Sequence, residues 1–331
     1  MAGVLAMILA GGEGTRLQPL TVTRSKPAVP FGGSYRLIDF VLNNFVNSDF
    51  LRIYVLTQFK SQSLYLHMKK GWNLTGITGR FIDPIPAQMR MGKRWYDGTA
   101  DAIYQNLGFV ELSAPDHVCI FGSDHIYKMD IRQMLDFHKE KKAVLTVAAI
   151  QVPIAEAHLF GIIEVDETGR MIGFEEKPAN PKSLPNDPNY ALASMGNYVF
   201  ETHTLYAELT SDAENENSSH DFGKDIIPTL LAQDKALYAY KFKGYWKDVG
   251  TIDSLWEANM DLLSPNSELD LNDPTWKIYT EDATSLPQYI CDTAVINTAF
   301  ITQGCVVEGE ITNSVLFTGV KVGPGAKIID S

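Results

Sequence analysis

The sequence predicts an α/β protein with a doubly wound, mainly parallel sheet, followed by the start of a parallel β-helix. Over the first two thirds of the chain, apolar runs rich in β-branched residues alternate with helical patterns. This alternation is typical of a parallel sheet covered by helices on both faces. From about residue 290, apolar residues recur at six-residue spacing, which is typical of a parallel β-helix.

The expected strands cover residues 4–10, 53–57, 118–121 and 144–150, and the helical patterns cover 61–70, 100–112 and 131–142. Ligands of such sheets bind beyond the carboxyl ends of the strands. The segment "GGEGTR" follows the first expected strand, and "GSDHIY" follows the third. We therefore expect both segments at one edge of the sheet, where they can share a ligand site.

The C-terminal repeat is carried by six residues in two series, which are Ala294, Phe300 and Val306, then Leu316, Val322 and Ile328. Their chance spacing in an ordinary β region is the open alternative. We divide the chain into an α/β domain (1–265), a linker (266–290) and a repeat region (291–331). A stack of this kind needs several repeats, so a natural protein that continues beyond Ser331 is one expectation.

Composition narrows the class of protein. Hydrophobic residues make up 45% of the chain and charged residues 21%, which is ordinary for a globular protein. No apolar run reaches the ~18–20 residues of a transmembrane helix, and the apolar N-terminus lacks the basic start of a signal peptide. Three scattered cysteines do not suggest a disulfide framework or a metal site. We expect a cytoplasmic protein that does not bind membranes.

The net charge of −12 is unevenly distributed. Residues 1–100 contain 12 Lys and Arg against 5 Asp and Glu, whereas the remainder contains 16 against 35. So acidic a chain is not expected to bind nucleic acid. The basic first third is either a chance feature of a solvated surface or the surroundings of a site for small polyanions, with downstream acidic residues holding a metal.

The first expected strand runs directly into Gly11, Gly12 and Gly14, and such a loop brings backbone N–H groups close to an anion. It is not the dinucleotide-binding fingerprint, because Leu17 stands where the third glycine is needed. Two fixed cations, Arg16 and Lys26, follow the loop instead. Cations at this place suit the neutralisation of a leaving pyrophosphate better than the binding of a cofactor.

Ten segments resemble the bacterial glucose-1-phosphate adenylyltransferases, a branch of the sugar nucleotidyltransferases. They are "LAGGEGTRL", "SKPAVPFGG", "RLIDF", "PAQ", "WYDGTADAIYQN", "SDHIYKMD", "FEEKPANP", "ASMGNYVF", "SSHDFGKDIIP" and "YWKDVGT". The resemblance extends over nearly the whole chain. "GxGTRL" is shared by sugar nucleotidyltransferases in general, whereas "WYDGTADA" and "SSHDFGKD" are more specific to the ADP-glucose branch.

The resemblance implies that ATP and glucose 1-phosphate react to give ADP-glucose and pyrophosphate, for glycogen synthesis. An oxygen of the sugar phosphate attacks the α-phosphorus in line, so the protein supplies alignment and charge neutralisation rather than a nucleophile. Asp124 and Asp248 match the aspartates that bind Mg²⁺ in the family. The resemblance also implies that the β-helix is left-handed, that the protein is a homotetramer and that the enzyme is allosterically regulated.

The remaining site residues also follow from the resemblance. Lys177 matches the lysine that binds the phosphate of glucose 1-phosphate, and it joins Arg16, Lys26, Asp124 and Asp248 as a predicted catalytic residue. The substrate-binding positions are Gly11 and Gly12 in the loop, Gln88, Gly98 and Thr99 for adenine, and Tyr96, Gly161, Glu176 and Ser194 for the glucosyl group. Asp221 either supports the sugar pocket or caps a helix before Phe222.

Arg24 and Arg36 are the predicted allosteric residues, for small anionic effectors such as sugar phosphates, AMP or phosphate. Thr23 stands where enteric enzymes activated by fructose 1,6-bisphosphate have lysine, and Pro30 replaces their histidine. The identity of the preferred effector is therefore open.

Two other functions remain as alternatives. A regulatory subunit of the same fold, without catalysis, would be expected to lack some of the lysine, arginine and aspartate residues just named, but all are present. An acyltransferase built on the β-helix would need a histidine among the coils, and the last histidine is His220.

Overall fold

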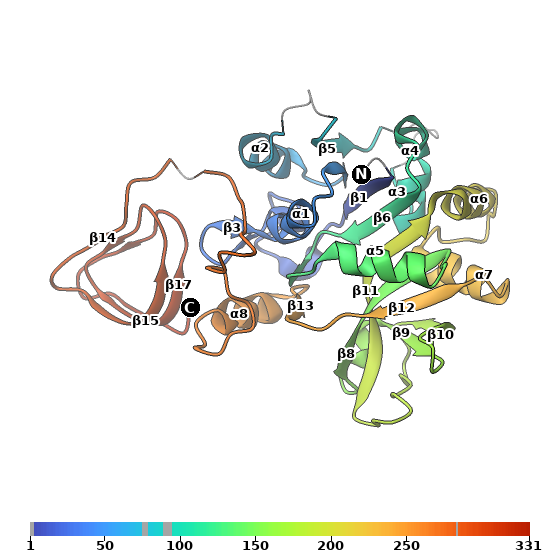
Figure 1. The fold of residues 1–331 in the computed structure, drawn as a ribbon. Helices are drawn as coiled ribbons and strands as arrows, with labels where there is room; N and C mark the ends of the chain where they lie inside the picture. The colour runs from blue at the N-terminus through green and yellow to red at the C-terminus, as the bar shows by residue number, and fades with distance from the viewer. Residues whose placement is uncertain (1–2, 75–78, 89–94, 283) are drawn as a thin grey trace.

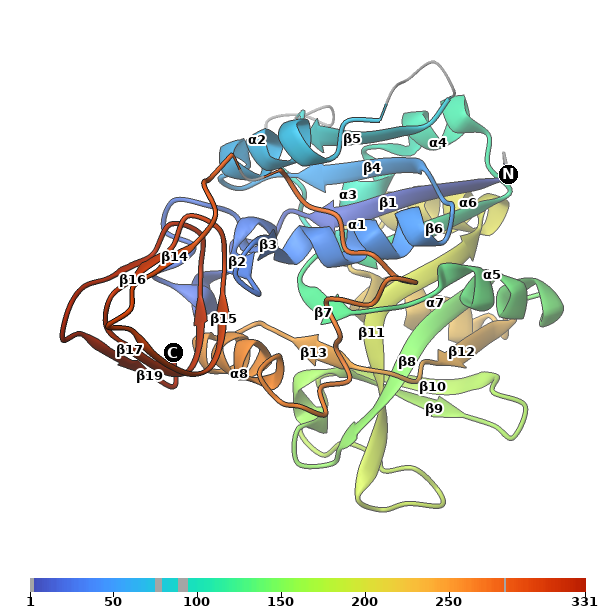
Figure 2. The same ribbon diagram turned by 60° about the vertical axis from the view of Figure 1, so that its left-hand side comes forward.

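The computed structural model describes residues 3–74, 79–88, 95–282 and 284–331, and its centre is a nine-stranded sheet (Figures 1 and 2). The sheet contains β1 (Val4–Ala10), β4 (Arg52–Thr57), β5 (Phe81–Pro86), β6 (His117–Gly122), β8 (Leu145–Pro153), β9 (Gly161–Val165), β10 (Met171–Glu176), β11 (Tyr190–Glu201) and β12 (Leu237–Lys241). Each predicted strand corresponds to one of these, namely β1, β4, β6 and β8.

The sheet is mixed rather than mainly parallel. β1 pairs in parallel with both β4 and β6, and β4 with β5, as strand–helix alternation predicts. The long strand β11 pairs antiparallel with β6, β8 and β9, and this half of the sheet carries β10 and β12 at its sides. The parallel half therefore agrees with the prediction, and the half built around β11 does not.

Helices cover both faces of the sheet, as doubly wound proteins require. On one face α1 (Leu37–Asn47), α2 (Gln62–Gly71) and α5 (Ile131–Glu140) bury residues such as Phe45, Leu64 and Met134. On the other face, α3 (Thr99–Tyr104), α4 (Leu107–Ser113), α6 (Thr202–Ala213) and α7 (Ile227–Ala232) bury residues such as Ile103 and Leu205. No helix among the described residues is long and apolar enough to cross a bilayer.

The helix predicted over residues 100–112 is two helices, α3 and α4. Between them, Gln105 donates from its side chain to the Asp101 carboxylate at 2.7 Å. Asn106 donates to the carbonyl of Ala102 at 2.8 Å and to the hydroxyl of Tyr96 at 3.0 Å. These side-chain hydrogen bonds lie at the break between α3 and α4. Apolar periodicity alone does not reveal this break.

Short elements surround the edge at which β1 and β6 end. They are the 3₁₀ turns η1 (Thr15–Leu17), η2 (Lys26–Ala28) and η4 (Ala157–Leu159), the strand pairs β2 (Pro30–Phe31) with β3 (Tyr35–Arg36) and β7 (His125–Tyr127) with β13 (Trp246–Asp248), the π-helix η5 (Phe222–Ile226) and α8 (Ile252–Asp261). Leu17, Phe31, Phe40 and Leu255 share one buried cluster, which fixes η1, β2 and α8 against α1.

The segment that leads to the C-terminal region lies along α1. Asn43 exchanges two hydrogen bonds with the backbone of Tyr279, at 2.7 and 2.8 Å. One turn away on each side, Asn47 donates to the carbonyl of Lys277 at 2.9 Å and Asp39 accepts from the hydroxyl of Thr280 at 2.7 Å. Residues four apart lie on one helix face, so a single face of α1 holds this linker segment.

The C-terminal region consists of short parallel strands in two three-stranded sheets (Figure 2). One sheet holds β14 (Tyr289–Ile290), β16 (Val306–Val307) and β18 (Lys321–Val322), and the other holds β15 (Val295–Ile301), β17 (Glu310–Leu316) and β19 (Lys327–Ile329). Val295 pairs with Glu310, and Glu310 with Lys327, so successive coils take 15 and 17 residues. This parallel stacking is compatible with the predicted β-helix.

The strict six-residue period is wrong in detail, because two of its six residues do not lie in the interior of the coils. The interior cluster contains Cys305 and Val307 on either side of Val306, which is half-buried. Phe300 instead packs against the cluster that holds η1 and α8 in the α/β domain. The sequence pattern does not distinguish an interior residue from one that joins two parts of the chain.

Candidate active site

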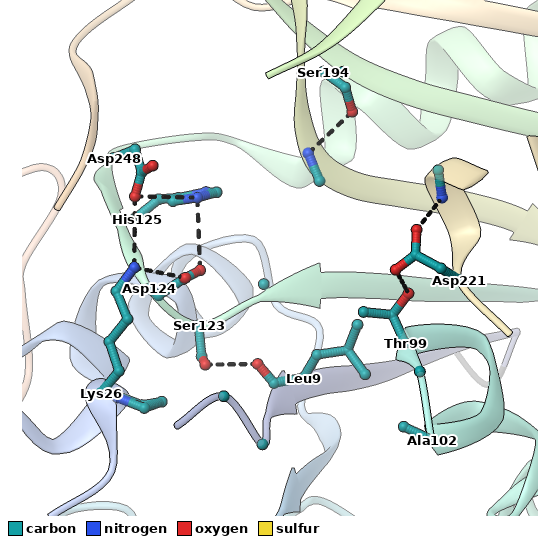
Figure 3. A pocket seen from close by; sticks show the side chains of 18 of the residues that line it. Leu9, Lys26, Thr99, Ala102, Ser123, Asp124, His125, Ser194, Asp221 and Asp248 are labelled. Carbon is teal, nitrogen blue, oxygen red and sulfur yellow. Dashed lines mark hydrogen bonds and ion pairs between the residues drawn. The ribbon is translucent and has the colours of Figure 1, made fainter. Parts of the chain in front are cut away.

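A cavity of about 560 Å³ opens at the carboxyl ends of β1 and β6, which is the predicted edge of the sheet (Figure 3). Its size suits a small-molecule ligand. The predicted site residues that line it are Gly11, Gly12, Arg16, Lys26, Tyr96, Gly98, Thr99, Asp124, Gly161, Glu176, Lys177, Ser194, Asp221 and Asp248. Gln88, Arg24 and Arg36 do not line it. The fold thus brings together residues separated by more than two hundred positions in the sequence.

The glycine loop leaves β1 and turns tightly beside Lys26. Gly14 adopts φ +66°, and a Cβ there would lie only 2.9 Å from the Cβ of Lys26. Thr21 closes the turn by donating to the carbonyl of Gly14 at 2.7 Å. The loop passes into η1, whose Leu17 is fully buried, so the side chain of Arg16 is held at the cavity. The turn requires glycine, and the buried leucine positions the arginine.

Three charged side chains meet on one side of the cavity. Nζ of Lys26 lies 2.8 Å from Asp124 Oδ2 and 3.5 Å from Asp248 Oδ1. Burial lowers the pKa of Lys26, but the two carboxylates outweigh it and leave this pKa above its usual value. Burial likewise raises the pKa of Asp124, but the Lys26 ammonium and His125 hold it well below its usual range. Lys26 and Asp124 are therefore both charged at neutral pH.

A short strand pair brings the two aspartates together. Asp124 follows β6, and Asp248 ends β13, where it is the direct partner of His125 on β7. Ser123 fixes the turn before β7 by donating to the carbonyl of Leu9 at the end of β1, at 2.6 Å (Figure 3). The sheet edge, rather than local sequence, thus sets the separation of the carboxylates.

His125 is a member of this cluster that the sequence analysis missed. Its Nε2 lies 3.6 Å from Asp124 Oδ1 and 3.9 Å from Asp248 Oδ1 (Figure 3). Its ring meets that of Trp246 edge-on, with the centroids 5.2 Å apart. The one signal in the sequence was that His125 directly follows Asp124. That signal is weak, because adjacent residues in extended chain normally point to opposite faces.

The cluster can hold a metal ion. Asp124, His125 and Asp248 each offer a ligand atom, and these atoms lie within 4.8 Å of one another. Oδ1 of Asp248 is buried and forms no hydrogen bond with any described residue, so its lone pairs are available. Carboxylate oxygens of this kind suit hard divalent cations such as Mg²⁺. The donor set therefore fits the divalent cation that nucleotidyltransferases generally use.

The opposite side of the cavity carries the ion pair of Glu176 and Lys177 together with uncharged groups. Glu176 ends β10, and the following Lys177 adopts φ +48° with its side chain 64% exposed, 3.4 Å from the Glu176 carboxylate. Gly161 is confined, because a Cβ there would come within 2.8 Å of Glu176 Oε2. Ser194 lies where β11 bulges, and its hydroxyl accepts from the amide of Gly196 at 3.2 Å. Carboxylate and hydroxyl groups of this kind can bind sugar hydroxyls.

Thr99 and Asp221 connect two walls of the cavity. Thr99 Oγ1 donates to Asp221 Oδ2 at 3.0 Å and accepts from the amide of Phe222 at the same distance. Asp221 Oδ1 caps η5 by accepting from the amides of Gly223 and Lys224. Of the two interpretations that the sequence left open, the helix cap is therefore present, while the same side chain also lines the cavity.

The predicted residues outside the cavity have separate surroundings. Gln88 is exposed two residues after β5, and residues 89–94, which follow it, lie outside the described part of the chain. Arg36 donates to the carbonyl of Ala28 at 3.2 Å and lies 3.9 Å from Glu281. The pKa of Arg36 is lowered from its usual value, mainly by burial and also by the nearby charge of Arg24, although Glu281 acts in the opposite direction. Arg24 and Arg36 thus form a cationic pair next to η2, which carries Lys26.

Comparison with known proteins identifies the family of this chain. Residues 5–265 match the family model described as nucleotidyl transferase. The glucose-1-phosphate adenylyltransferase of Photobacterium profundum is 62% identical over the whole chain and 85% of its own length. An enzyme of that name from Vibrio cholerae serotype O1 is 69% identical over 85% of this chain and 71% of its own. The chain therefore belongs to the nucleotidyl transferase family, among the glucose-1-phosphate adenylyltransferases.

Proposed function

We propose that this chain transfers the adenylyl group of ATP to glucose 1-phosphate, giving ADP-glucose and pyrophosphate. The observation that carries the proposal is the cavity itself, in which the Lys26–Asp124–Asp248 cluster faces the polar groups of Glu176 and Ser194. Relatives named glucose-1-phosphate adenylyltransferase support the choice of nucleotide and sugar.

Each wall of the cavity has a role in this proposal. Backbone amides at Gly11 and Gly12 and the side chain of Arg16 bind the β- and γ-phosphates that leave as pyrophosphate. Lys26 neutralises the phosphate chain. Asp124 and Asp248 hold Mg²⁺, which when bound withdraws charge from the reacting phosphate.

On the sugar side, Lys177 binds the phosphate of glucose 1-phosphate, which attacks the α-phosphorus in line. The glucosyl hydroxyls are bound by the Glu176 carboxylate and the Ser194 hydroxyl, with Tyr96 and the backbone at Gly161 beside them. Gly98 and Thr99 bind the nucleotide, together with Gln88. No residue becomes covalently attached, so alignment and charge neutralisation supply the rate enhancement.

The test is pyrophosphate release from glucose 1-phosphate and Mg²⁺ with ATP, UTP, dTTP or GTP in parallel. The proposal expects ATP to give the highest kcat/KM. A higher value with UTP or dTTP contradicts the choice of base. Release with none of the four would instead favour the regulatory-subunit alternative.

We further propose that the enzyme acts in glycogen synthesis in the cytoplasm, as a homotetramer whose activity responds to small anionic effectors bound at Arg24 and Arg36. The cationic pair that these two residues form beside η2 supports an anion site. We also propose that the parallel C-terminal coils form a left-handed β-helix. Residues 291–331 contain no histidine, so nothing in these coils favours the acyltransferase alternative.

A further inference from the structure

The carbonyl of His220 fixes the start of α3. It accepts from the amides of Ala100 and Asp101 at 2.8 and 3.3 Å. The preceding Gly98 lies so close that a Cβ there would come within 2.2 Å of the same carbonyl oxygen. Because Gly98 and Thr99 line the cavity, the position of this one carbonyl determines where that part of the cavity wall stands.

His220 is itself held in an unfavourable conformation. Its φ is +54°, in the left-handed region that costs a residue with a Cβ about 1–2 kcal/mol. Its Nδ1 lies 2.8 Å from Asp212 Oδ2 and must donate there, since a carboxylate can only accept. The amide of His220 donates to Ser218 Oγ at 2.9 Å, and that hydroxyl donates to Asp212 Oδ1 at 2.6 Å. Asp212 thus anchors the turn at two points.

Asp212 also stands at an unfavourable place. It lies in the last turn of α6, where the helix macrodipole disfavours a carboxylate. Its side chain is only 11% exposed, and that of His220 only 14%. Figure 1 shows α6 beside α3, so the anchor reaches from the end of one helix to the start of the other. The positive φ of His220 and the carboxylate at the end of α6 are each locally unfavourable. Together they hold the His220 carbonyl in a fixed position.

We propose that Asp212 and His220 are positioning residues for the nucleotide. They fix the His220 carbonyl, which holds Gly98 and Thr99 in place, and the two hydrogen bonds of Thr99 then connect this wall to Asp221 on the sugar side. The proposal rests on the proposed function, because Gly98 and Thr99 are nucleotide-binding residues only if ATP is the substrate. Neither Asp212 nor His220 lines the cavity.

Three variants of the full chain test this role. His220→Ala removes the Nδ1 donor and keeps the cost of a positive φ. His220→Asn is the conservative variant, because its amide nitrogen stands where Nδ1 stood and asparagine tolerates the left-handed region. Asp212→Asn removes the charge of the anchor. The matched control is Asp234→Ala, at φ +53°, which breaks an exposed ion pair with Arg170; neither of these two residues lines the cavity.

Three measurements are made on each variant, and the first two, hydrogen exchange and steady-state kinetics, test the positioning role. Hydrogen exchange at the amides of Ala100 and Asp101 reports the hydrogen bonds to the His220 carbonyl without any substrate. Steady-state kinetics with ATP and glucose 1-phosphate report the cavity, and thermal unfolding reports the stability of the fold. In His220→Ala we expect faster exchange at both amides and a fall of roughly 10- to 100-fold in kcat/KM for ATP, as expected when a binding wall is displaced. We expect the KM for ATP to rise more than the KM for glucose 1-phosphate.

His220→Asn should restore both the slow exchange and the kcat/KM for ATP, Asp212→Asn should be intermediate, and Asp234→Ala should resemble the wild type in both measurements. Faster exchange in His220→Ala with an unchanged KM for ATP would overturn the proposal, as would an asparagine variant no better than alanine. If His220→Ala does not fold, Asp212→Asn decides by the same two readouts. Failure of the proposed function is recognised separately, because the wild type would then release no pyrophosphate from ATP, and the nucleotide-positioning role would fail with it.

Discussion

Lys26→Met would remove the ammonium that lies between two carboxylates while keeping most of the side chain's length and apolar stem. In the wild type this ammonium lies 2.8 Å from Asp124 and 3.5 Å from Asp248. Without it, the two carboxylates face each other with no cation between them. We therefore expect the variant to be less stable than the wild type when no divalent cation is present, and to regain stability when Mg²⁺ is added.

The magnitude follows from the burial of the two partners. A hydrogen bond to a charged group contributes about 1.5–3 kcal/mol. Lys26 is buried, but the side chain of Asp124 is 36% exposed, so solvent screening reduces the expected loss to about 1–2 kcal/mol. For a domain of this size that loss lowers the melting temperature by about 2–4 °C.

The pH dependence of the loss follows from the signs of the two pKa shifts. The pKa of Asp124 is lowered from 3.8, so its stabilisation is present above pH 3.8 and is lost as the pH falls through the lowered value. The pKa of Lys26 is raised from 10.5, so its stabilisation is present below pH 10.5 and is lost as the pH rises through the raised value. Wild type and variant should therefore differ most between these limits and converge outside them.

The assay is thermal unfolding of both proteins in EDTA and in millimolar MgCl₂. Lys247→Met is the matched control, because Lys247 also joins two carboxylates, Glu257 at 2.9 Å and Asp261 at 3.7 Å, but does not line the cavity. Only Lys26→Met should gain more stability from Mg²⁺ than the wild type does. Equal melting temperatures of Lys26→Met and the wild type in EDTA would refute the reasoning, and so would an equal Mg²⁺ response in all three proteins.

Three further predictions concern single side chains. Asp124→Ala should lower kcat by at least ~100-fold, because a metal held there would act when charge moves to the leaving group, whereas Lys177→Ala should mainly raise the KM for glucose 1-phosphate. If steady-state kinetics show the reverse, the roles of the two residues are exchanged. Thr23→Lys should lower the half-activating concentration of fructose 1,6-bisphosphate, since a charged hydrogen bond contributes roughly 1.5–3 kcal/mol, and an activation curve that is unchanged or shifted upward would remove position 23 from the effector site. Gly98→Ala should raise the KM for ATP, because its Cβ would lie within 2.2 Å of the His220 carbonyl; an unchanged KM would mean that the wall moves without consequence.

The sequence alone predicts the parts of this site that follow from local patterns. Val4–Ala10 is a continuous apolar run that ends in glycines, so both the strand and its loop could be foreseen. The motif words around Asp124 and Asp248 identified two carboxylates that the fold then brings to one cavity. In each case a short stretch of residues carries the signal by itself.

What could not be foreseen depends on contacts between distant segments. The part played by His125 follows from the pairing of β7 with β13, whose partners are more than a hundred residues apart. The antiparallel direction of β11 and the outward position of Phe300 depend on which surfaces meet after folding. The anchor of His220 to Asp212 is short-range, but neither residue belongs to a pattern that signals a left-handed turn.

Because of the hydrogen bonds between α1 and the linker segment, substitutions in that segment should have different consequences from insertions or deletions. Asn43 and Asn47 bind main-chain atoms of Tyr279 and Lys277, and every residue type except proline offers the same backbone atoms. The identities of residues 277 and 279 can therefore vary without loss of these bonds. The number of residues in this segment cannot vary, because the hydrogen-bonding side chains recur with each turn of α1. One residue inserted or deleted between 277 and 280 would shift the backbone of the segment away from them. Homologous chains should accordingly tolerate substitutions in this segment far more readily than changes in its length.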